Sequence, residues 1–358
     1  MSKNRYIRQT ILKDFGATAQ QKLLNARVLI IGAGGLGVPV LQYLNAMGVG
    51  TIGLIDNDVV SLSNLHRQVL YTEQDIDKPK VDVAIAKLKA QNSSTAFVGY
   101  HSFLTKENAI DIIKKYDVVV DASDNFPTRY LVNDACVLLN KPFIYGALHS
   151  FEGYVSVFNY QGGPTYRCLF AKPPKAEEIP NCNEQGVLGV IPGIIGNLQA
   201  LETVKVITEI GTPLSGKLLI FNGLEQTSHT FAIPLIPQNL KLEKLQDSYE
   251  LACLSDISLI AAAQFKTLLE TNTQIQLIDV RTPEEFKEFH LNEAVNIPLD
   301  TLEGGHHSID YKAPIYVLCQ SGVRSLKALQ QLKSYHPEAT LFQIEGGLNQ
   351  LNLYAVRD

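Results

Sequence analysis

Two short stretches of the chain carry residues whose types and spacing could do chemistry. In "VLCQSGVRSLKAL" (317–329) a β-like run ends in Cys319, and Arg324 follows after four intervening residues. Backbone N–H groups curled around the sulfur, the N-terminus of a following helix and the Arg324 guanidinium would each lower the thiol pKa and stabilise an anionic sulfur. In "VLIIGAGGLG" (28–37) glycines follow a strand-like run, which lets the backbone approach a phosphate.

The glycine-rich stretch matches G-x-G-x-x-G between an expected strand and an expected helix, with glycines at 32, 34, 35 and 37: Gly32, Gly34, Gly35 and Gly37. Asp56 ends the next expected strand, where a carboxylate can accept hydrogen bonds from ribose hydroxyls. Asp58 lies two residues further and can face the same site. These residues alone fit NAD(P) as well as ATP, so both a nicotinamide dehydrogenase and an ATP-dependent enzyme stay open.

Short apolar runs rich in Val, Ile and Leu alternate with helix-like stretches between residues 27 and 147. Such runs are typical of parallel strands covered by helices on both faces. After residue 150 further runs predict antiparallel strands, with a helix over about 192–210. The sequence therefore predicts an α/β fold with a mainly parallel sheet and an antiparallel extension, whose strands cover 27–32, 51–56, 96–100, 117–122, 142–148, 153–160, 216–223 and 228–235.

The pattern changes at residues 236–256, a polar stretch without a sustained period that we assign as a linker. From about residue 257 the alternation of strands and helices restarts, with strands expected at 275–280 and 314–319. Roughly 100 residues suffice for a second small α/β domain. We therefore predict a nucleotide-binding domain over 1–235, a linker over 236–256 and a second domain over 257–358.

Composition excludes several classes of protein. The 358 residues carry a net charge of −5, which gives no support to nucleic-acid binding. The longest uncharged stretch, 185–201, is shorter than the roughly 20 residues that span a bilayer. Five scattered cysteines argue against a disulfide framework. We expect a cytoplasmic protein that binds neither nucleic acid nor membranes.

Several longer motifs extend the glycine-rich turn, in one order along the chain: "RYIRQTIL" (5–12), "LIDNDVVSLSNLHRQVL" (54–70), "DKPKVDVAIAKLKAQN" (77–92) and "DASDNFPTRYLVNDA" (121–135). Together they resemble the MoeB/ThiF/HesA group of adenylyltransferases in the ubiquitin-activating superfamily. The resemblance runs from about residue 5 to 232 and implies a Rossmann-like ThiF/MoeB fold.

The resemblance implies binding of ATP with Mg²⁺ and of the C-terminal Gly-Gly tail of a ubiquitin-like carrier protein. The tail carboxylate would attack the α-phosphate, and cations and a metal would offset the developing charge. The resemblance also implies a homodimer. The site residues implied by matching positions are Arg67 and Lys80 at the phosphates, Asn64 beside them, Asp56 at the ribose, Asp124 at Mg²⁺ and Arg8 reaching the partner's ATP. Asp124 could instead cap the helix that starts near Pro127.

The positions of the cysteines bear on whether the protein binds zinc. Many members of this group bind zinc through two Cys-x-x-Cys pairs, but here Thr165 stands where one cysteine would be, leaving Cys168, and the second pair is absent. Zinc needs about four ligands, so we predict no zinc site. In relatives a cysteine at the position of Cys182 can bond covalently to the activated carrier, and a buried hydrophobic role is the alternative. Cys136 is expected in the core, and Cys253 has no motif around it.

The region from 277 to 351 resembles a rhodanese, a small α/β domain that carries sulfur as a cysteine persulfide. The resemblance rests on "LIDVRTPEEFKEFHLNEAVNIPL" (277–299), "IYVLCQSGVRSLKALQQL" (315–332) and "IEGGLNQL" (344–351). Phosphatases of this fold have five residues between Cys and Arg, whereas four here favour the smaller sulfur. An inactive docking module is a further alternative. Glu293 replaces a frequent Gly, and Leu351 replaces a frequent Trp.

The two resemblances combine into one expected reaction. The first domain would adenylate the carrier's C-terminal glycine, and the Cys319 persulfide would supply sulfur for a thiocarboxylate. Molybdopterin synthesis is the predicted pathway, with thiamine synthesis and tRNA thiolation as alternatives and a cysteine desulfurase as the expected donor. Outside this class, an NAD(P)-dependent oxidoreductase and a non-catalytic scaffold stay open.

Overall fold

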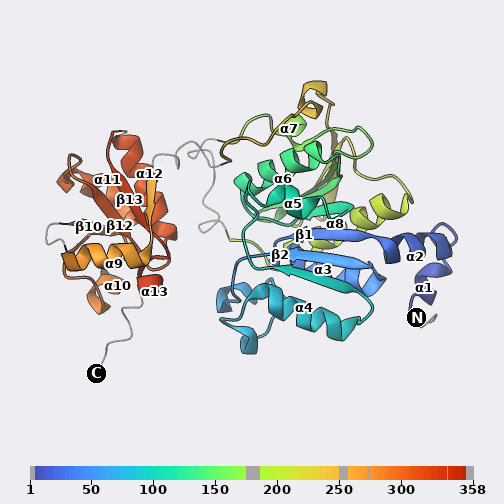
Figure 1. Ribbon diagram of the computed structural model, residues 1–358, viewed down its shortest axis with the longest axis horizontal. Coiled ribbons are helices and arrows are strands. Elements are labelled where there is room, and N and C mark those ends of the chain that lie inside the picture. Colours follow the sequence, from blue (N-terminus) through green and yellow to red (C-terminus); the bar gives the residue numbers. More distant parts are fainter. Residues whose placement is uncertain (1–4, 175–185, 250–256, 272–274, 337, 352–358) are drawn as a thin grey trace. The chain divides into compact units, whose positions relative to one another are not determined.

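The computed structural model describes residues 5–174, 186–249, 257–271, 275–336 and 338–351. The chain divides into two compact units, and the main division along the chain falls after Tyr249, while residues 174–179 group with the second unit (Figure 1). Each unit has its own sheet and its own hydrophobic core. The units are therefore described separately.

The first unit is built on an eight-stranded sheet in the order β3-β2-β1-β4-β5-β6-β7-β8. The first five strands of that order run parallel, and the last three pair antiparallel. This confirms the predicted fold. The strands are β1 (Arg27–Ile31), β2 (Thr51–Ile55), β3 (Ala96–Tyr100), β4 (Val118–Asp121), β5 (Phe143–His149), β6 (Glu152–Phe158), β7 (Lys217–Asn222) and β8 (Thr227–Ala232).

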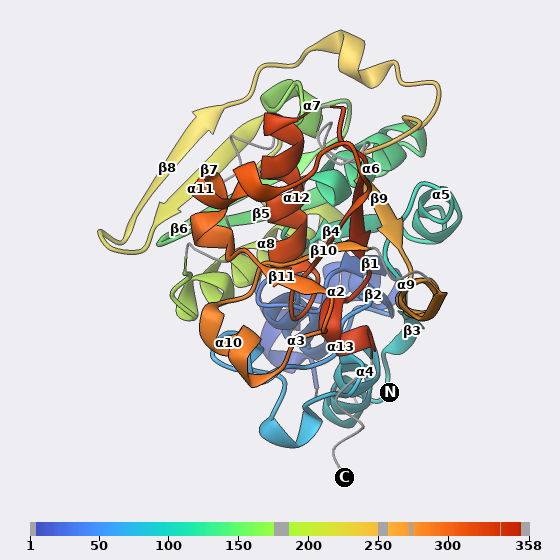
Figure 2. The ribbon, with the colours of Figure 1, turned by 90° about the vertical axis from the view of Figure 1, so that its left-hand side faces the viewer.

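The central strands are apolar on both faces because each face meets helices. In β1, Val28 and Ile30 enter one core, whereas Leu29 and Ile31 enter the other. Figure 2 shows helices on both sides of the sheet. The helices of this unit are α1 (Ile7–Thr10), α2 (Gly16–Asn25), α3 (Gly37–Met47), α4 (Lys80–Gln91), α5 (Ala109–Ile113), α6 (Phe126–Leu138), α7 (Tyr166–Leu169) and α8 (Val190–Thr208).

Helix α8 is a core helix. Among the described residues it is the one helix long and apolar enough to cross a membrane, yet 56% of that stretch is buried within the protein. Ala200 and Val204 join the core beneath α3, and Ile195 packs with Val155 of β6. Its apolar character is thus explained by packing against protein on several sides.

The segment 236–249, assigned to the linker from its sequence, lies against the first unit. The Tyr249 hydroxyl donates to Asp134 Oδ2 at 2.8 Å, and Lys106 Nζ donates to the carbonyl of Asp247 at 2.6 Å. The segment also contains a short 3-10 helix, η4 (Pro237–Leu240). Only residues 250–256 of the assigned linker follow it, and they lie outside the described residues.

The second unit has a five-stranded, all-parallel sheet in the order β11-β10-β12-β13-β9. Three of its strands were not predicted because each is partly exposed and lacks a continuous buried run: β9 (Ile257–Ile260), β11 (Ala294–Asn296) and β13 (Leu341–Ile344). The others are β10 (Gln276–Asp279) and β12 (Ile315–Leu318), and the helices are α9 (Ala262–Thr271), α10 (Pro283–Glu288), α11 (Leu302–Gly305), α12 (Val323–Tyr335) and α13 (Gly347–Leu351).

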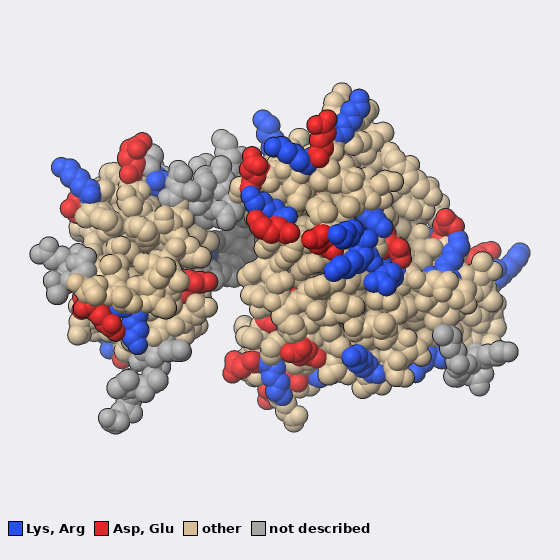
Figure 3. Space-filling view, viewed as in Figure 1, with Lys and Arg blue, Asp and Glu red and all other residues tan. Residues whose placement is uncertain are grey.

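Charged side chains of both signs are interspersed on the face of the protein seen in Figure 3. Lys and Arg lie next to Asp and Glu, in keeping with a net charge of only −5. Nucleic acid is bound by an extended basic surface. This face therefore gives no support to nucleic-acid binding.

Because each unit has its own core, damage to one core should leave the other intact. We expect Leu329→Ala, which empties a fully buried position beneath the second sheet, to destabilise that unit by about 2–5 kcal/mol. Calorimetry of the full chain should show one thermal transition moving and the other unchanged. Leu41→Ala in the first core is the matched control and should move the other transition. A shift of both transitions by Leu329→Ala would contradict two independent cores.

Candidate functional site

The glycine-rich turn joins β1 to α3 with no room for side chains at two positions. Gly32 has a φ of +99°, and a Cβ there would lie 2.8 Å from the carbonyl oxygen of Ala122. A Cβ on Gly37 would lie 1.9 Å from the carbonyl oxygen of Gly32. At Gly34 a Cβ would make only an ordinary contact, at 3.7 Å. The turn therefore packs tightly against neighbouring backbone at Gly32 and Gly37, whereas Gly34 has space around it for a ligand to approach the backbone.

The carboxylate of Asp56 fixes this turn to the end of β2. Its Oδ2 accepts the N–H of Ala33 at 2.7 Å, and its Oδ1 accepts the N–H of Asp58 at 2.7 Å. Burial raises the pKa of Asp56, and these hydrogen bonds partly offset that shift. Each carboxylate oxygen keeps a second lone pair, so contact with a ribose hydroxyl stays chemically possible.

Lys80 is a buried cation at the start of α4. Its side chain is 5% exposed, and its Nζ donates to Asp58 Oδ2 at 2.8 Å. The Asp58 side chain is 62% exposed. Asp58, expected at the site on spacing alone, is therefore the carboxylate that pairs with Lys80. A buried ammonium needs such a partner, and a phosphate could take its place.

The segment after β2 brings Arg67 beside the glycine-rich turn. Asn64 ends the 3-10 helix η1 (Leu62–Asn64), and its Oδ1 accepts the N–H of Ser61 at 3.4 Å. The Arg67 guanidinium donates to the carbonyl of Ser63 at 3.0 Å. The Cγ of Arg67 lies 3.5 Å from where a Cβ on Gly35 would be. Arg67 thus stands next to the turn, whereas Asn64 caps its own local helix.

Asp124 follows β4 and is exposed. The cap of α6 is Asn125, whose Oδ1 accepts the N–H of Thr128 at 2.9 Å. The alternative in which Asp124 caps this helix is therefore wrong. Since β1, β2 and β4 are adjacent parallel strands, Asp124 shares their carboxyl edge with the glycine-rich turn and Asp56.

A buried polar group that the sequence reasoning missed lies at the end of β4. The Asp121 carboxylate accepts the Ser123 hydroxyl at 2.6 Å, burial raises its pKa, and the charge of Arg129 counteracts that rise. Gln199 Nε2 donates to the Asp121 carbonyl at 2.7 Å. Among the described residues, the buried atoms without a partner include Asp121 Oδ2, Arg129 Nε, Gln199 Oε1 and Tyr166 Oη. The sequence signal for this group was the presence of Asp121 and Arg129 within the otherwise apolar strand β4 and helix α6.

Arg8 is not brought to this edge. It is exposed on α1, and its neighbour Gln9 donates to the carbonyl of Met47, the last residue of α3. The glycine-rich turn lies at the other end of α3, about 16 Å away along an 11-residue helix. Cys182, the remaining candidate of this unit, lies outside the described residues.

In the second unit the sulfur of Cys319 sits in a closed backbone loop between β12 and α12. The residue is fully buried. Its Sγ accepts the N–H of Gly322 at 3.2 Å and lies 3.6 Å from the Ser325 hydroxyl. Gly322 has a φ of +90°, which turns the chain into the helix. The loop presents the N–H of Gly322 and the start of α12 to the sulfur, in keeping with the expectation from the sequence.

Arg324 is held by a partner that the sequence reasoning missed. Its two terminal nitrogens donate to the two oxygens of Glu285 at 2.6 and 2.7 Å. Hydrogen bonding to Arg324 lowers the pKa of Glu285 to about 2. Thr282 and Glu285 also form a capping box at the start of α10, and T-x-x-E in the sequence was the available signal. Arg324 is therefore fixed near the loop through a carboxylate.

The paired glycines of "IEGG" brace the sulfur loop from behind. Gly347 has a φ of +59°, and a Cβ there would lie 2.2 Å from the carbonyl oxygen of Cys319. The N–H of Leu348 donates to that carbonyl at 3.0 Å. Leu351, found where a Trp is frequent, is buried in the core. Glu293 is exposed.

Cys168 lies at the centre of a small hydrogen-bonded cluster. Its Sγ accepts N–H groups from Thr165 at 3.4 Å, Ile236 at 3.4 Å and Asn239 Nδ2 at 3.6 Å. Burial opposes ionisation, but these hydrogen bonds lower the pKa of Cys168 overall. Cys136 is fully buried, whereas Cys253 lies outside the described residues. No group of three or more possible metal ligands occurs among the described residues.

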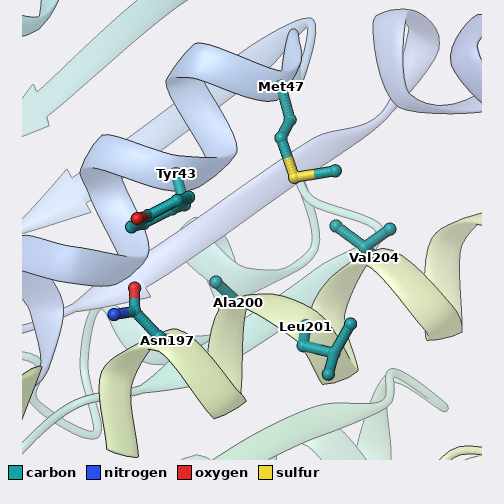
Figure 4. Close-up of a pocket in the computed structure, with 6 residues that line it drawn as sticks. All are labelled: Tyr43, Met47, Asn197, Ala200, Leu201 and Val204. Atoms are coloured by element: carbon teal, nitrogen blue, oxygen red, sulfur yellow. The ribbon is translucent and has the colours of Figure 1, made fainter. Parts of the chain in front are cut away.

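An apolar cavity of 320 Å³ lies between α3 and α8 (Figure 4). Tyr43 and Met47 line it from the second half of α3, away from the glycine-rich turn, together with Asn197, Ala200, Leu201 and Val204. Its lining carries no charge that could hold phosphate. The cavity is therefore distinct from the candidate nucleotide site.

The pairing of Glu285 with Arg324 predicts a pH dependence of stability. Because the pKa of Glu285 falls from 4.5 to about 2 on folding, its contribution is complete above about pH 4.5 and is lost as the pH falls towards 2. We expect Glu285→Gln to be less stable than the parent at about pH 5.5, with a smaller difference at about pH 3. Circular dichroism in urea measures this, with exposed Glu284→Gln as control. A difference that is constant with pH would contradict the pairing.

Comparison with known proteins agrees with this geometry. The ThiF family model matches residues 6–241, and the rhodanese-like domain model matches residues 261–353. Adenylyltransferase and sulfurtransferase MOCS3 of Aedes aegypti is 40% identical over 96% of this chain and 85% of its own length. Sulfur carrier protein adenylyltransferase of Thermus thermophilus is 50% identical over 66% of this chain and 89% of its own length.

A solved structure gives the same result for the first unit. MccB of E. coli with ATP superimposes with a TM-score of 0.59 at 27% identity, covering 66% of this chain and 73% of that chain. ThiF-family adenylyltransferases use ATP, so the nicotinamide alternative loses its support. The chain is an enzyme that joins an adenylyltransferase to a sulfurtransferase domain. By its sequence and its fold, the chain belongs to the ThiF family and carries a rhodanese-like domain at its C-terminal side.

Proposed function

We propose that this enzyme activates the C-terminal glycine of a ubiquitin-like sulfur carrier with ATP and then converts it to a thiocarboxylate. The observation that carries the proposal is the presence of two complementary sites in one chain. The glycine-rich edge with Lys80 and Arg67 suits a polyphosphate, and the Cys319 loop suits an anionic sulfur.

In the first half-reaction the carrier carboxylate attacks the α-phosphate of ATP and pyrophosphate leaves. Gly34 exposes the backbone to the phosphates, and Lys80 and Arg67 balance their charge, with Asn64 beside them. Lys80 would exchange Asp58 for a phosphate oxygen, and Asp56 would accept ribose hydroxyls. Bound Mg²⁺ would supply further positive charge, and exposed Asp124 is the carboxylate at this edge suited to hold it.

In the second half-reaction the terminal sulfur of a Cys319 persulfide attacks the activated carbonyl carbon. AMP leaves, and an acyl disulfide joins the carrier to Cys319. Two equivalents of a cellular thiol then reduce the S–S bond and become a disulfide, which releases the thiocarboxylate and returns Cys319 to the thiol. The N–H of Gly322 and the start of α12 stabilise sulfur anions during these steps.

The biological setting of this chemistry is also a proposal. Relatives named MOCS3 agree with molybdenum cofactor synthesis, and with tRNA thiolation as the alternative. Thiamine synthesis rests on the sequence resemblance. A cysteine desulfurase would load Cys319, and the described cysteines, all free, suit a reducing cytoplasm. We further propose that Cys182 can form a covalent link with the activated carrier, which the mass of the enzyme after incubation with the carrier and ATP would show.

We also propose that the enzyme binds no zinc. Where relatives bind zinc, this sequence has one thiol, Cys168. Ile236 and Asn239 present N–H groups to its sulfur instead of metal-ligating atoms. Hydrogen-bond donors cannot coordinate a cation, and zinc needs about four ligands. The Cys168 cluster thus suits a metal-free role.

Thiocarboxylate formation is measured directly by the mass of the carrier. Incubation with a Gly-Gly-terminated carrier, ATP, Mg²⁺ and a sulfur donor should add about 16 Da, an oxygen-to-sulfur exchange. Cys319→Ala should abolish this product but keep ATP–pyrophosphate exchange. Lys80→Ala should lower the exchange itself by about 100-fold or more. Exchange that survives Lys80→Ala undiminished would contradict the phosphate role.

Arg8 is proposed to complete the ATP site of a partner in a homodimer. Its distance from the glycine-rich turn within one chain supports this, as do exposed apolar side chains nearby: Ile7, Ile11, Leu12, Tyr43 and Leu201. Subunit exchange between the inactive variants Arg8→Ala and Lys80→Ala would create mixed dimers with one intact site. We expect about a quarter of the parental exchange rate to return. If no activity returns on mixing, Arg8 does not act across a dimer.

A further inference from the structure

The segment 236–249, here called the strap, is held to the first unit, and the second unit follows it along the chain. It contains one short 3-10 helix and no strand within its described residues. A polar stretch of this kind has little reason to stay in place by itself. Three separate contacts hold it, and each involves a different part of the first unit.

The first contact is the Cys168 cluster on α7. The sulfur receives the N–H of Ile236 and the side-chain amide of Asn239, at 3.4 and 3.6 Å, from opposite ends of one turn of the strap. Cys168 is only 9% exposed. Since hydrogen bonds to this sulfur lower its pKa against the effect of burial, the contact gains strength as the thiol ionises.

The second contact holds the last residue of the strap. Asp134 on α6 is fully buried and pairs in a bidentate way with Arg167, with both distances 2.7 Å. The Tyr249 hydroxyl completes this pair by donating to Asp134 Oδ2. The Tyr249 ring and Leu245 pack against the core beside α6. A buried ion pair therefore fixes the point where the strap ends.

The third contact is a hydrogen bond from Lys106, which precedes α5, to the carbonyl of Asp247. Together the contacts leave only residues 250–256 between Tyr249 and the start of β9 at Ile257. A fully extended chain of seven residues reaches about 25 Å at most. Without the contacts the connection would be 21 residues, 236–256, and about threefold longer in reach.

We infer that the strap is a positioning device that raises the local concentration of Cys319 at the activated carrier by shortening the tether. This rests on the proposed function, in which Cys319 acts on a carrier activated by the same molecule. Effective concentration falls roughly as the −3/2 power of tether length once the tether spans the sites. Lengthening it from 7 to 21 residues should therefore slow sulfur transfer about fivefold.

The release variant combines Asn239→Ala, Leu245→Ala, Tyr249→Ala and Lys106→Ala, so that each of the three contacts loses a side chain. We expect ATP–pyrophosphate exchange to be unchanged and single-turnover sulfur transfer from preloaded Cys319 persulfide to fall about fivefold. The matched control changes exposed neighbours on the same strap, Glu243→Ala with Lys244→Ala, and should alter neither rate. Equal losses in both half-reactions would show that the strap only stabilises the first unit and would overturn the inference.

A second measurement keeps every contact of the strap intact. Flexible spacers of about 7 and about 14 residues inserted after Tyr249 should slow transfer about threefold and about fivefold, the latter matching the release variant. A transfer rate that does not depend on spacer length would overturn the inference. Complete absence of thiocarboxylate from the unaltered enzyme would instead contradict the proposed function, so the two failures are distinguishable.

Discussion

The carboxylate of Asp56 is the interaction on which the first site depends. It binds the N–H of Ala33 in the glycine-rich turn and the N–H of Asp58, two residues beyond itself. One partly buried group thereby holds both the turn and Asp58, the partner of Lys80, in place. Burying a carboxylate costs free energy unless such hydrogen bonds satisfy it. The sheet contributes the rest, because adjacent parallel strands end at one edge.

The two sites solve the same physical problem with related means. In the proposed function each would bind an anion at the end of a parallel strand, where a glycine with positive φ turns the chain towards a helix: Gly32 before α3 and Gly322 before α12. Each also pairs its cation with a carboxylate, Asp58 for Lys80 and Glu285 for Arg324. Anionic intermediates of phosphorus and of sulfur can thus be handled by one chain with two small loops.

Local features of both sites could be predicted from the sequence because they depend on neighbouring residues. The glycine-rich turn, the end of β2 at Asp56 and the loop after Cys319 are of this kind. Partner choice across the fold could not be predicted. Glu285 lies 39 residues from Arg324, and Ile236 lies 68 residues from Cys168. Such pairs depend on how the helices pack, and short exposed strands such as β11 leave too weak a pattern to be recognised.

The ion pair between Lys80 and Asp58 has a consequence for ligand selectivity. The ammonium is already desolvated and ordered, so an incoming ligand does not have to order it. An anion that takes the position of Asp58 must nevertheless displace a carboxylate that is 2.8 Å away. A weakly charged ligand competes poorly with that carboxylate, whereas the dense charge of a triphosphate competes well. If Lys80 binds phosphate as proposed, the resting pair therefore disfavours ligands that carry little negative charge.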